Sequence, residues 1–157
     1  MIDSSTFRTV LSRLASGVSV VTTVGTDGRD HGMTVSALCA LSLDPPLVLL
    51  CVDKSATMHP HLVAASHFAV NLLALEQESL SRRFAESTDT KFDGVTVTRQ
   101  MTGCALIDGA LAHLECTMWA QHVGGDHTIF VGQVGGADAR NADPLLYYRG
   151  GYARLDR

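Results

Sequence analysis

Residues 31–57 read HGMTVSALCALSLDPPLVLLCVDKSAT, and this stretch predicts two strands joined by a proline turn. Side chains alternate between the two faces of a strand, so Thr34 and Ser36 place their hydroxyls on the same face. Residues 44–46, Asp-Pro-Pro, interrupt the pattern because proline has no amide donor and restricts the residue before it. Residues 47–52 then form a continuous apolar run of strand length.

The second of these strands ends in a small polar cluster made of Asp53, Lys54, Ser55 and Thr57. Two hydroxyls, one ammonium group and the unpaired amides of a helix beginning near Thr57 would suit a phosphate group. The stretch therefore indicates a cradle for a phosphorylated planar cofactor. A plain hairpin followed by a helix N-cap would produce the same pattern.

Length and composition limit the class of protein. The chain has 157 residues, of which 46% are hydrophobic and 18% charged, and its formal net charge is −4. These values predict one globular domain, residues 1–157, and argue against disorder, membrane spanning and non-specific binding to nucleic acid. The first 17 residues contain no apolar segment of the signal-peptide type, so we expect a cytoplasmic protein.

Known reactive-site motifs give no assignment. The four cysteines form no C-x-x-C pair and lie in apolar or alternating segments, so they are expected to be buried and no metal site is predicted. The patterns G-x-S-x-G, H-E-x-x-H, G-x-x-x-x-G-K-[ST] and G-x-G-x-x-G do not occur, and no pair of carboxylates is placed for acid and base catalysis.

The remaining elements predict an antiparallel barrel with helical decoration. Apolar residues at helical spacing (Phe7, Val10, Leu11 and Leu14) predict an amphipathic helix packed on a sheet or on a partner subunit. Residues 112–121 alternate as a half-buried strand, Gly124-Gly125 predicts a hairpin turn, and residues 145–155 predict a last strand broken by glycines. Six to eight strands joined mostly by short turns favour this mainly β architecture over a parallel βαβ sheet.

Several segments together resemble the flavin reductase-like family, the small reductase partners of two-component flavin-dependent monooxygenases. They are residues 17–57, HFAVNLLA (67–74), RRFAE (82–86), KFDG (91–94), GGDHTIFVGQV (124–134) and PLLYYRGGY (144–152). The resemblance implies an antiparallel split β-barrel of the FMN-binding type, usually a homodimer. It also implies reduction of FMN or FAD by NADH or NADPH, with the reduced flavin passed to a separate monooxygenase.

The resemblance further implies roles for individual residues. Thr34, Val35, Ser36 and Ala37 would line the flavin ring, and Cys51, Val52, Asp53, Lys54, Ser55 and Thr57 would hold the ribityl phosphate, with Asp53 pointing away from it. Asn71 would lie near the ring, and Lys91 would approach the cofactor. His127 would contact the nicotinamide of NADH or NADPH, with Arg149 and Tyr152 bordering that pocket. No catalytic proton carrier is expected, because hydride transfer is the chemistry of the cofactors.

Two other functions fit the same barrel. One is an FMN-dependent oxidase acting on an organic substrate, and the other is a non-catalytic protein that binds or stores flavin. The Gly-Asp-His segment at 125–127 and the Arg-Gly-Gly-Tyr segment at 149–152 favour the reductase over both. Without the family, His127 would be read as an exposed polar residue at the mouth of a hairpin.

Overall fold

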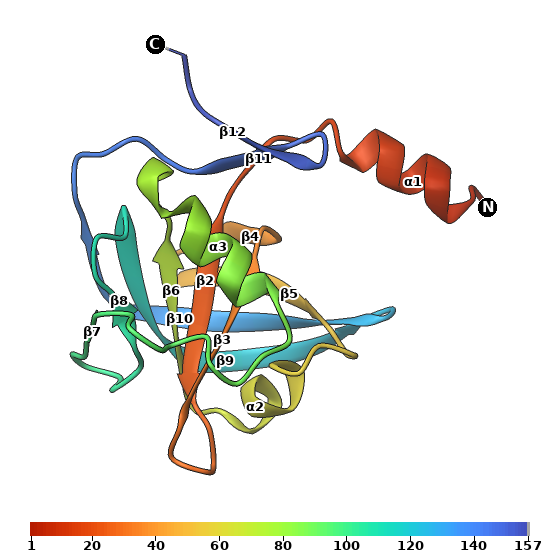
Figure 1. Cartoon of the computed structure of the whole chain (residues 1–157). Helices are drawn as coiled ribbons and strands as arrows, with labels where there is room; N and C mark the ends of the chain where they lie inside the picture. The colour runs from red at the N-terminus through yellow and green to blue at the C-terminus, as the bar shows by residue number, and fades with distance from the viewer. Residues whose placement is uncertain (157) are drawn as a thin grey trace.

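A seven-stranded antiparallel sheet forms the body of the computed structural model, which describes residues 1–156 (Figure 1). Its strand order is β3-β2-β6-β9-β10-β5-β4. These strands are β2 (Ser19–Val24), β3 (Asp30–Val35), β4 (Leu38–Leu43), β5 (Pro46–Asp53), β6 (His67–Leu72), β9 (Ala112–Gly124) and β10 (His127–Ala139). The fold is therefore mainly β and antiparallel, which confirms the predicted class.

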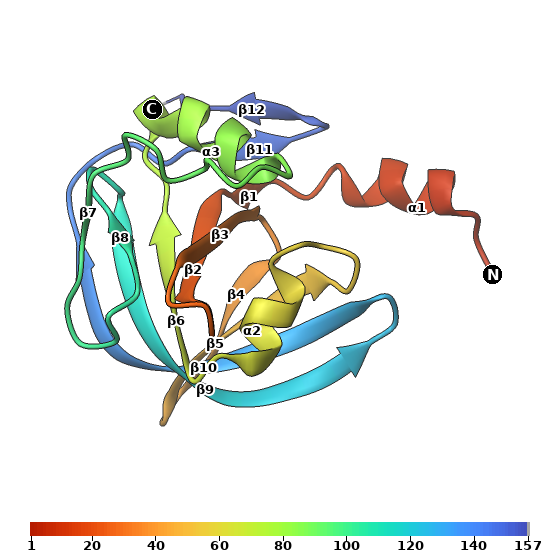
Figure 2. The same cartoon turned by 60° about the horizontal axis from the view of Figure 1, so that its bottom comes forward.

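Smaller elements decorate this sheet. The helices are α1 (Ser4–Leu11), α2 (His59–Ala64) and α3 (Glu78–Ala85), with one 3-10 turn, η1 (Leu75–Gln77). A second sheet contains β1 (Ser16–Gly17), β11 (Leu146–Tyr148) and β12 (Gly151–Ala153), and a third contains β7 (Val97–Thr98) and β8 (Leu106–Ile107). Helix α3 lies beside β11 and β12, whereas α2 lies near the opposite end of the barrel (Figures 1 and 2).

The large sheet curls on itself (Figure 2), and the buried side chains inside it form an apolar core. Alternate residues of β5 are buried, and they pack with Phe68 of β6 and Phe130 of β10, both of which are fully buried. Gly132 lies directly beside the Phe68 ring, so a Cβ at this position would come within 2.3 Å of that ring. A second apolar cluster, which includes Val20, Phe84 and Leu145, lies beneath α3.

The first strand predicted within residues 31–57 is interrupted in the structure. The sequence predicts one strand before the proline turn, but Ser36 and Ala37 belong to neither β3 nor β4. These two residues join strands that lie at opposite edges of the sheet, and we call this two-residue connection the seam. So short a connection limits the distance between the Cα atoms of Val35 and Leu38 to about 10 Å. The sheet must therefore curl until its edges nearly meet.

Glycines define the two hairpins nearest the candidate site. The β9–β10 turn consists of Gly125 and Asp126, one residue later than predicted, with Gly125 at φ 68°. The last predicted strand is itself a hairpin, β11–β12, whose turn places Arg149 and Gly150 at φ 55° and 81°. Two successive left-handed residues are typical of the type I′ turn, whose twist matches that of the paired strands.

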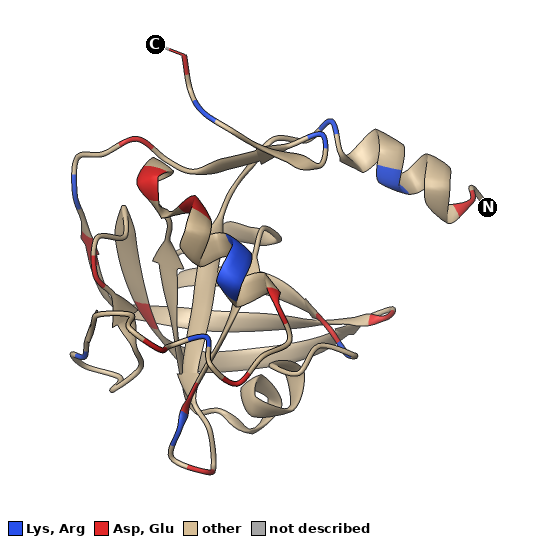
Figure 3. Cartoon of the chain, in the orientation of Figure 1, with Lys and Arg blue, Asp and Glu red and all other residues tan. Residues whose placement is uncertain are grey.

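Helix α1 projects from the barrel and leaves its apolar face uncovered (Figures 1 and 2). The Asp3 carboxylate caps it by accepting from the amides of Ser5 and Thr6 at 2.9 Å each. No residue of the helix is buried, and Phe7 and Val10 are 53% and 58% exposed. Arg8 is its only charged residue (Figure 3). The alternative that this helix packs on its own sheet is wrong.

The cysteines are only partly as expected. Cys104 and Cys116 are buried, and burial raises the pKa of Cys116 to about 12. Cys51 is half-buried, but Cys39 is exposed because β4 is an edge strand with most of its residues at the surface. Within residues 1–156, no group of three or more potential ligands could hold a metal ion. In the same residues, no helix has the length and apolar character needed to cross a membrane.

Candidate functional site

Three of the predicted site residues line one cavity of about 190 Å³, which we call the tyrosine pocket. Thr34 comes from the end of β3, Ser36 from the seam and Tyr152 from β12. The walls of the tyrosine pocket are Val18, Thr34, Ser36, Ser81, Ala85, Tyr147 and Tyr152. The fold thus brings residues more than 110 positions apart in sequence to a single opening beside α3.

Ser81 of α3 connects two walls of the tyrosine pocket. The Thr34 hydroxyl donates to the Ser81 carbonyl oxygen at 2.6 Å, and the Ser81 and Tyr152 hydroxyl oxygens lie 2.7 Å apart. The Arg82 guanidinium carbon stands 4.7 Å from the centre of the Tyr152 ring and also pairs with Glu78. Arg82 lines an adjoining cavity of about 380 Å³, which shares Tyr152 with the tyrosine pocket.

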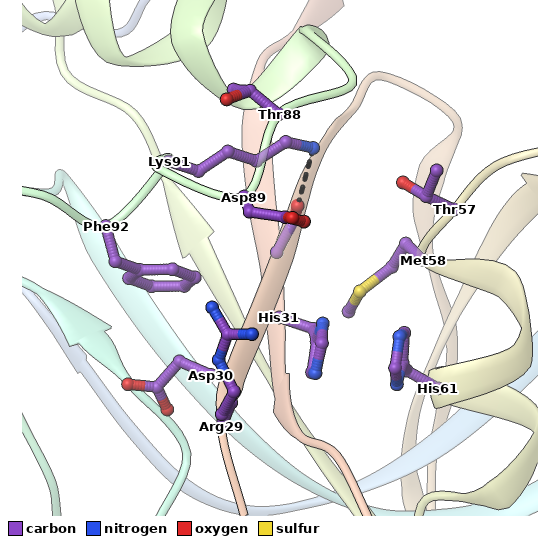
Figure 4. A pocket seen from close by; sticks show the side chains of 11 residues that line it. Arg29, Asp30, His31, Thr57, Met58, His61, Thr88, Asp89, Lys91 and Phe92 are labelled. Carbon is purple, nitrogen blue, oxygen red and sulfur yellow. Dashed lines mark hydrogen bonds between the residues drawn. The ribbon is translucent and has the colours of Figure 1, made fainter. Parts of the chain in front are cut away.

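A second cavity of about 100 Å³ joins Thr57 and Lys91, and we call it the histidine pocket (Figure 4). Lys91 is 8% exposed, and its ammonium donates to the carbonyl oxygens of Gly32 and Phe84 at 3.1 and 3.2 Å. Burial lowers the pKa of this lysine. Because an ammonium has three donors, one remains for the histidine pocket.

Two histidines that were not predicted as site residues form one wall of the histidine pocket. The rings of His31 and His61 are stacked, with their centres 3.4 Å apart and their planes at 14° (Figure 4). His31 Nε2 lies 3.1 Å from both carboxylate oxygens of Asp27. Burial, and then the neighbouring His31, lower the pKa of His61. The contact between the rings therefore disfavours a second charge on the pair.

The polar end of β5 differs from the predicted phosphate clamp. Asp53 Oδ1 accepts from the Ser55 amide at 2.7 Å and from the Ser55 hydroxyl at 2.8 Å, and these bonds lower the Asp53 pKa. The Lys54 ammonium donates to the Gly125 carbonyl oxygen at 2.7 Å. Helix α2 begins at His59 with Met58 as its N-cap, close to Thr57 as predicted, but it has only six residues and its cap makes no side-chain hydrogen bond. The Asp53 carboxylate thus satisfies the amide and hydroxyl of Ser55, and the Gly125 carbonyl holds the Lys54 ammonium, so these groups are already paired without an anion.

His127 lies at this same end of the barrel. It pairs with Asp53 in the β10–β5 register, and its Nδ1 lies 2.8 Å from the Asp126 carboxylate. The His127 side chain is 41% exposed. The structure therefore places the predicted nicotinamide contact beside the predicted phosphate segment, and within residues 1–156 no hydrogen bond or ion pair joins it to Arg149 or Tyr152.

Three predicted site residues lie in the core. Val35 and Val52 point into the barrel, so only their main chains are available to a ligand. Asn71 is fully buried, with its amide nitrogen donating to Val20 and Ala105 and its oxygen accepting from Ile107. The polar groups of Asn71 thus hold β2, β6 and β8 together, and its place near a bound ring stays a prediction.

Three more predicted site residues, Ala37, Cys51 and Arg149, are held by main-chain hydrogen bonds. The Ala37 carbonyl oxygen accepts from the Cys51 amide at 3.0 Å, so the seam is tied to β5. Arg149 is exposed at the tip of the β11–β12 hairpin, and its amide donates to the Ser12 carbonyl oxygen at 2.9 Å. Its guanidinium makes no hydrogen bond or ion pair within residues 1–156.

The chain is similar to known proteins over nearly its whole length. The profile of the flavin reductase like domain matches residues 11–156. The chain belongs to the flavin reductase-like family. The recognition made from the sequence segments is thereby confirmed.

Relatives within the flavin reductase-like family are similar over nearly the whole chain. The reductase subunit HsaB of a flavin-dependent monooxygenase from Rhodococcus jostii (strain RHA1) is 38% identical over 99% of this chain and 80% of its own length. The FMN reductase (NADH) SmoA of Agrobacterium fabrum is 41% identical over 99% and 88%. The solved structure of Streptomyces globisporus NADH:FAD oxidoreductase SgcE6, in complex with NAD and FAD fragments, is 40% identical, covers 98% of this chain and 93% of that one, and has a TM-score of 0.93.

Within this flavin reductase-like domain, four residues that make the contacts described above, in the two pockets and the adjoining cavity, were missed from the sequence. They are His31, His61, Ser81 and Arg82. The Arg-Arg-Phe-Ala-Glu segment at 82–86 was singled out, and Ser81 directly precedes it. Helical periodicity places Ser81 on the same face as Phe84, three residues later, and both are buried against the barrel. This periodicity was the available signal.

Proposed function

We propose that this chain is an NAD(P)H:flavin oxidoreductase that reduces FMN or FAD with NADH or NADPH and supplies the reduced flavin to a separate flavin-dependent monooxygenase. Its relatives SmoA and SgcE6 are named as an FMN reductase using NADH and an NADH:FAD oxidoreductase, and HsaB is named as a monooxygenase reductase subunit. The observation that carries the proposal is the tyrosine pocket, where Thr34 and Ser36 of the predicted flavin strand meet Tyr152 of the predicted nicotinamide segment.

The residues present fit a flavin. The tyrosine pocket combines hydroxyl groups with aromatic walls, which suits a planar ring that carries carbonyl and N–H groups. Gly32 lines the histidine pocket and Thr34 the tyrosine pocket, so the two pockets lie about 7 Å apart along β3. A flavin ring on Thr34 and Ser36 would accordingly direct its phosphate towards Thr57 and Lys91.

The work of the protein in this reaction is positioning. A bound flavin accepts a hydride from the reduced nicotinamide, and this step needs no proton carrier from the chain. The pocket residues must instead hold the two rings with the reacting atoms about 3–3.5 Å apart. The Lys91 ammonium and the Thr57 hydroxyl supply charge and a hydrogen bond for a phosphate.

A direct assay tests this function. The protein is mixed with NADH or NADPH and with FMN, FAD or riboflavin, and the absorbance of the reduced nicotinamide is followed. We expect its loss to depend on both the protein and the flavin. Flavin binding without oxidation of either nucleotide would favour the storage protein, whereas flavin reduction only by an added organic substrate would favour the oxidase.

We expect His127→Ala to lower kcat/KM for NADH by roughly 5- to 150-fold, the effect of losing a polar contact worth about 1–3 kcal/mol. His127 is held by the β9–β10 hairpin and does not line the tyrosine pocket, so flavin affinity should change by less than about twofold. Stopped-flow reduction at varied NADH and flavin titration measure the two effects. Loss of flavin binding with normal reduction of the flavin that remains bound would contradict the assignment.

We expect Thr57→Val to weaken FMN binding by about tenfold, because it removes a charge-assisted hydrogen bond to the phosphate. Riboflavin lacks the phosphate, so its affinity should be nearly unchanged. Ser55→Ala is the matched comparison and should have a smaller effect, because its hydroxyl already donates to Asp53. Fluorescence titrations with both flavins decide the matter, and equal losses for FMN and riboflavin would locate the phosphate site elsewhere.

We further propose that the protein is a homodimer and acts in the cytoplasm. The uncovered apolar face of α1 supports the dimer, since a surface of this kind is stable when a partner buries it. The cytoplasmic location agrees with the use of nicotinamide dinucleotides. Light scattering at micromolar protein concentration, with flavin present, distinguishes a dimer from a single chain of 16.7 kDa.

A further inference from the structure

Ser81 was not among the residues expected at the site, yet it is the only residue that hydrogen-bonds to both Thr34 and Tyr152 within residues 1–156. Its main-chain oxygen accepts from the Thr34 hydroxyl, and its side chain contacts the Tyr152 hydroxyl. Thr34 belongs to β3 and Tyr152 to β12, which lie in different sheets. A single residue of α3 therefore joins the two walls.

The direction of each hydrogen bond follows from burial. The Thr34 hydroxyl spends its only proton on the Ser81 carbonyl, so it can offer a ligand only an acceptor oxygen. Ser81 is fully buried, and within residues 1–156 its hydroxyl has the Tyr152 oxygen as its only partner. A buried hydroxyl that only accepted would leave its proton unpaired, so Ser81 donates to Tyr152. The Tyr152 hydroxyl proton then remains available to the tyrosine pocket.

We propose that Ser81 is a positioning residue that fixes the hydrogen-bonding direction of both walls, with an acceptor from Thr34 and a donor from Tyr152. The inference rests on the proposed flavin reductase function. An acceptor on the flavin strand matches a ring N–H of the flavin. A donor on the opposite wall matches the carboxamide oxygen of the nicotinamide. The Arg82 guanidinium lies over the Tyr152 ring and adds a cation–π contact to the hydrogen bond that Ser81 makes with its hydroxyl.

Two substitutions separate the two connections. Ser81→Ala removes the hydroxyl but keeps the carbonyl that holds Thr34, so it should act on the nicotinamide side alone. Thr34→Val removes the acceptor and should act on the flavin side. Ser79→Ala is the matched control, since Ser79 lies on the same helix with its side chain exposed.

We expect Ser81→Ala to lower kcat/KM for NADH by about 5- to 20-fold, mainly through KM, and to leave the flavin Kd within about twofold. Tyr152→Phe should have a similar effect, and the double variant should lose little more than Tyr152→Phe alone, because both remove the same contact. Thr34→Val should raise the flavin Kd, measured by fluorescence quenching, by about 5- to 10-fold. Ser79→Ala should match the wild type in both measurements.

Several results would overturn the inference. One is a Ser81→Ala variant with unchanged use of NADH. Another is an equal loss of NADH use and flavin affinity in that variant, which would mean a displaced helix. Independent, multiplying effects in the double variant would also exclude a shared contact. A wild type that binds flavin but oxidises neither NADH nor NADPH would overturn the proposed function instead, and the flavin Kd of Thr34→Val would still decide the flavin half of the inference.

Discussion

Asn71→Leu is expected to lower the free energy of unfolding by about 3 kcal/mol, the largest stability effect we predict for a single substitution. Leucine has a similar volume but cannot accept from the Ile107 amide, which now donates to Asn71 at 2.7 Å. A buried amide left unpaired costs about 1–3 kcal/mol, and the lost bond to Val20 adds to this cost. The Ala105 carbonyl is less affected because Thr22 also donates to it.

Chemical denaturation of the two proteins measures this difference. Asn141→Leu is the control, because Asn141 is exposed and the same change there should alter stability by no more than about 0.5 kcal/mol. Folded Asn71→Leu protein should bind flavin with nearly the wild-type affinity, since the side chain does not face either pocket. A stable variant with specifically weakened flavin binding would instead indicate that Asn71 contacts the flavin.

The second large effect concerns the apolar face of α1. Replacing both Phe7 and Val10 by aspartate should weaken the proposed dimer by about a thousandfold or more. Burial of such side chains contributes about 1.5–3 kcal/mol each, and both protomers lose it. Light scattering at micromolar concentration should therefore find single chains of 16.7 kDa in the variant.

A matched variant separates this effect from that of added charge. Ser5→Asp with Thr9→Asp introduces the same two charges on the opposite face of the same helix, and it should remain dimeric. Flavin affinity is measured in parallel, to establish whether the flavin site depends on the proposed dimer. A dimeric Phe7→Asp, Val10→Asp protein would show that α1 is not the contact.

Local sequence patterns were sufficient for much of the sheet. The alternation over residues 112–121 predicted the inner part of β9, and Gly124-Gly125 predicted the β9–β10 hairpin to within one residue. Gly150-Gly151 marked the break between β11 and β12 but was read as an interruption of one strand. The bond between Asp53 and Ser55 is also local, because an aspartate often binds the amide two residues later. This signal was present in the sequence, and it would have removed Ser55 from the phosphate clamp.

Other features depend on contacts that no local pattern contains. Periodicity shows that Asn71 faces one side of its strand, but not that β8 covers that side with an amide to be satisfied. Ser81 and Tyr152 are 71 residues apart, so their contact exists only once α3 and β12 pack together. The stacking of His31 on His61 likewise requires α2 to lie over β3.

The seam has a consequence for the motions of the barrel. It ties the end of β3 to the start of β4, whereas the other ends of these edge strands, at Asp30 and Leu43, lie on opposite edges and are not joined by strand pairing. We therefore expect local opening of the barrel to separate the two edge strands at their unpaired ends, while the seam keeps their other ends together. The hydrogen bond from the Cys51 amide to the Ala37 carbonyl oxygen lies at this seam. The surface proposed for the flavin, at Thr34 and Ser36, should thus keep its shape when the far ends of the two edge strands separate.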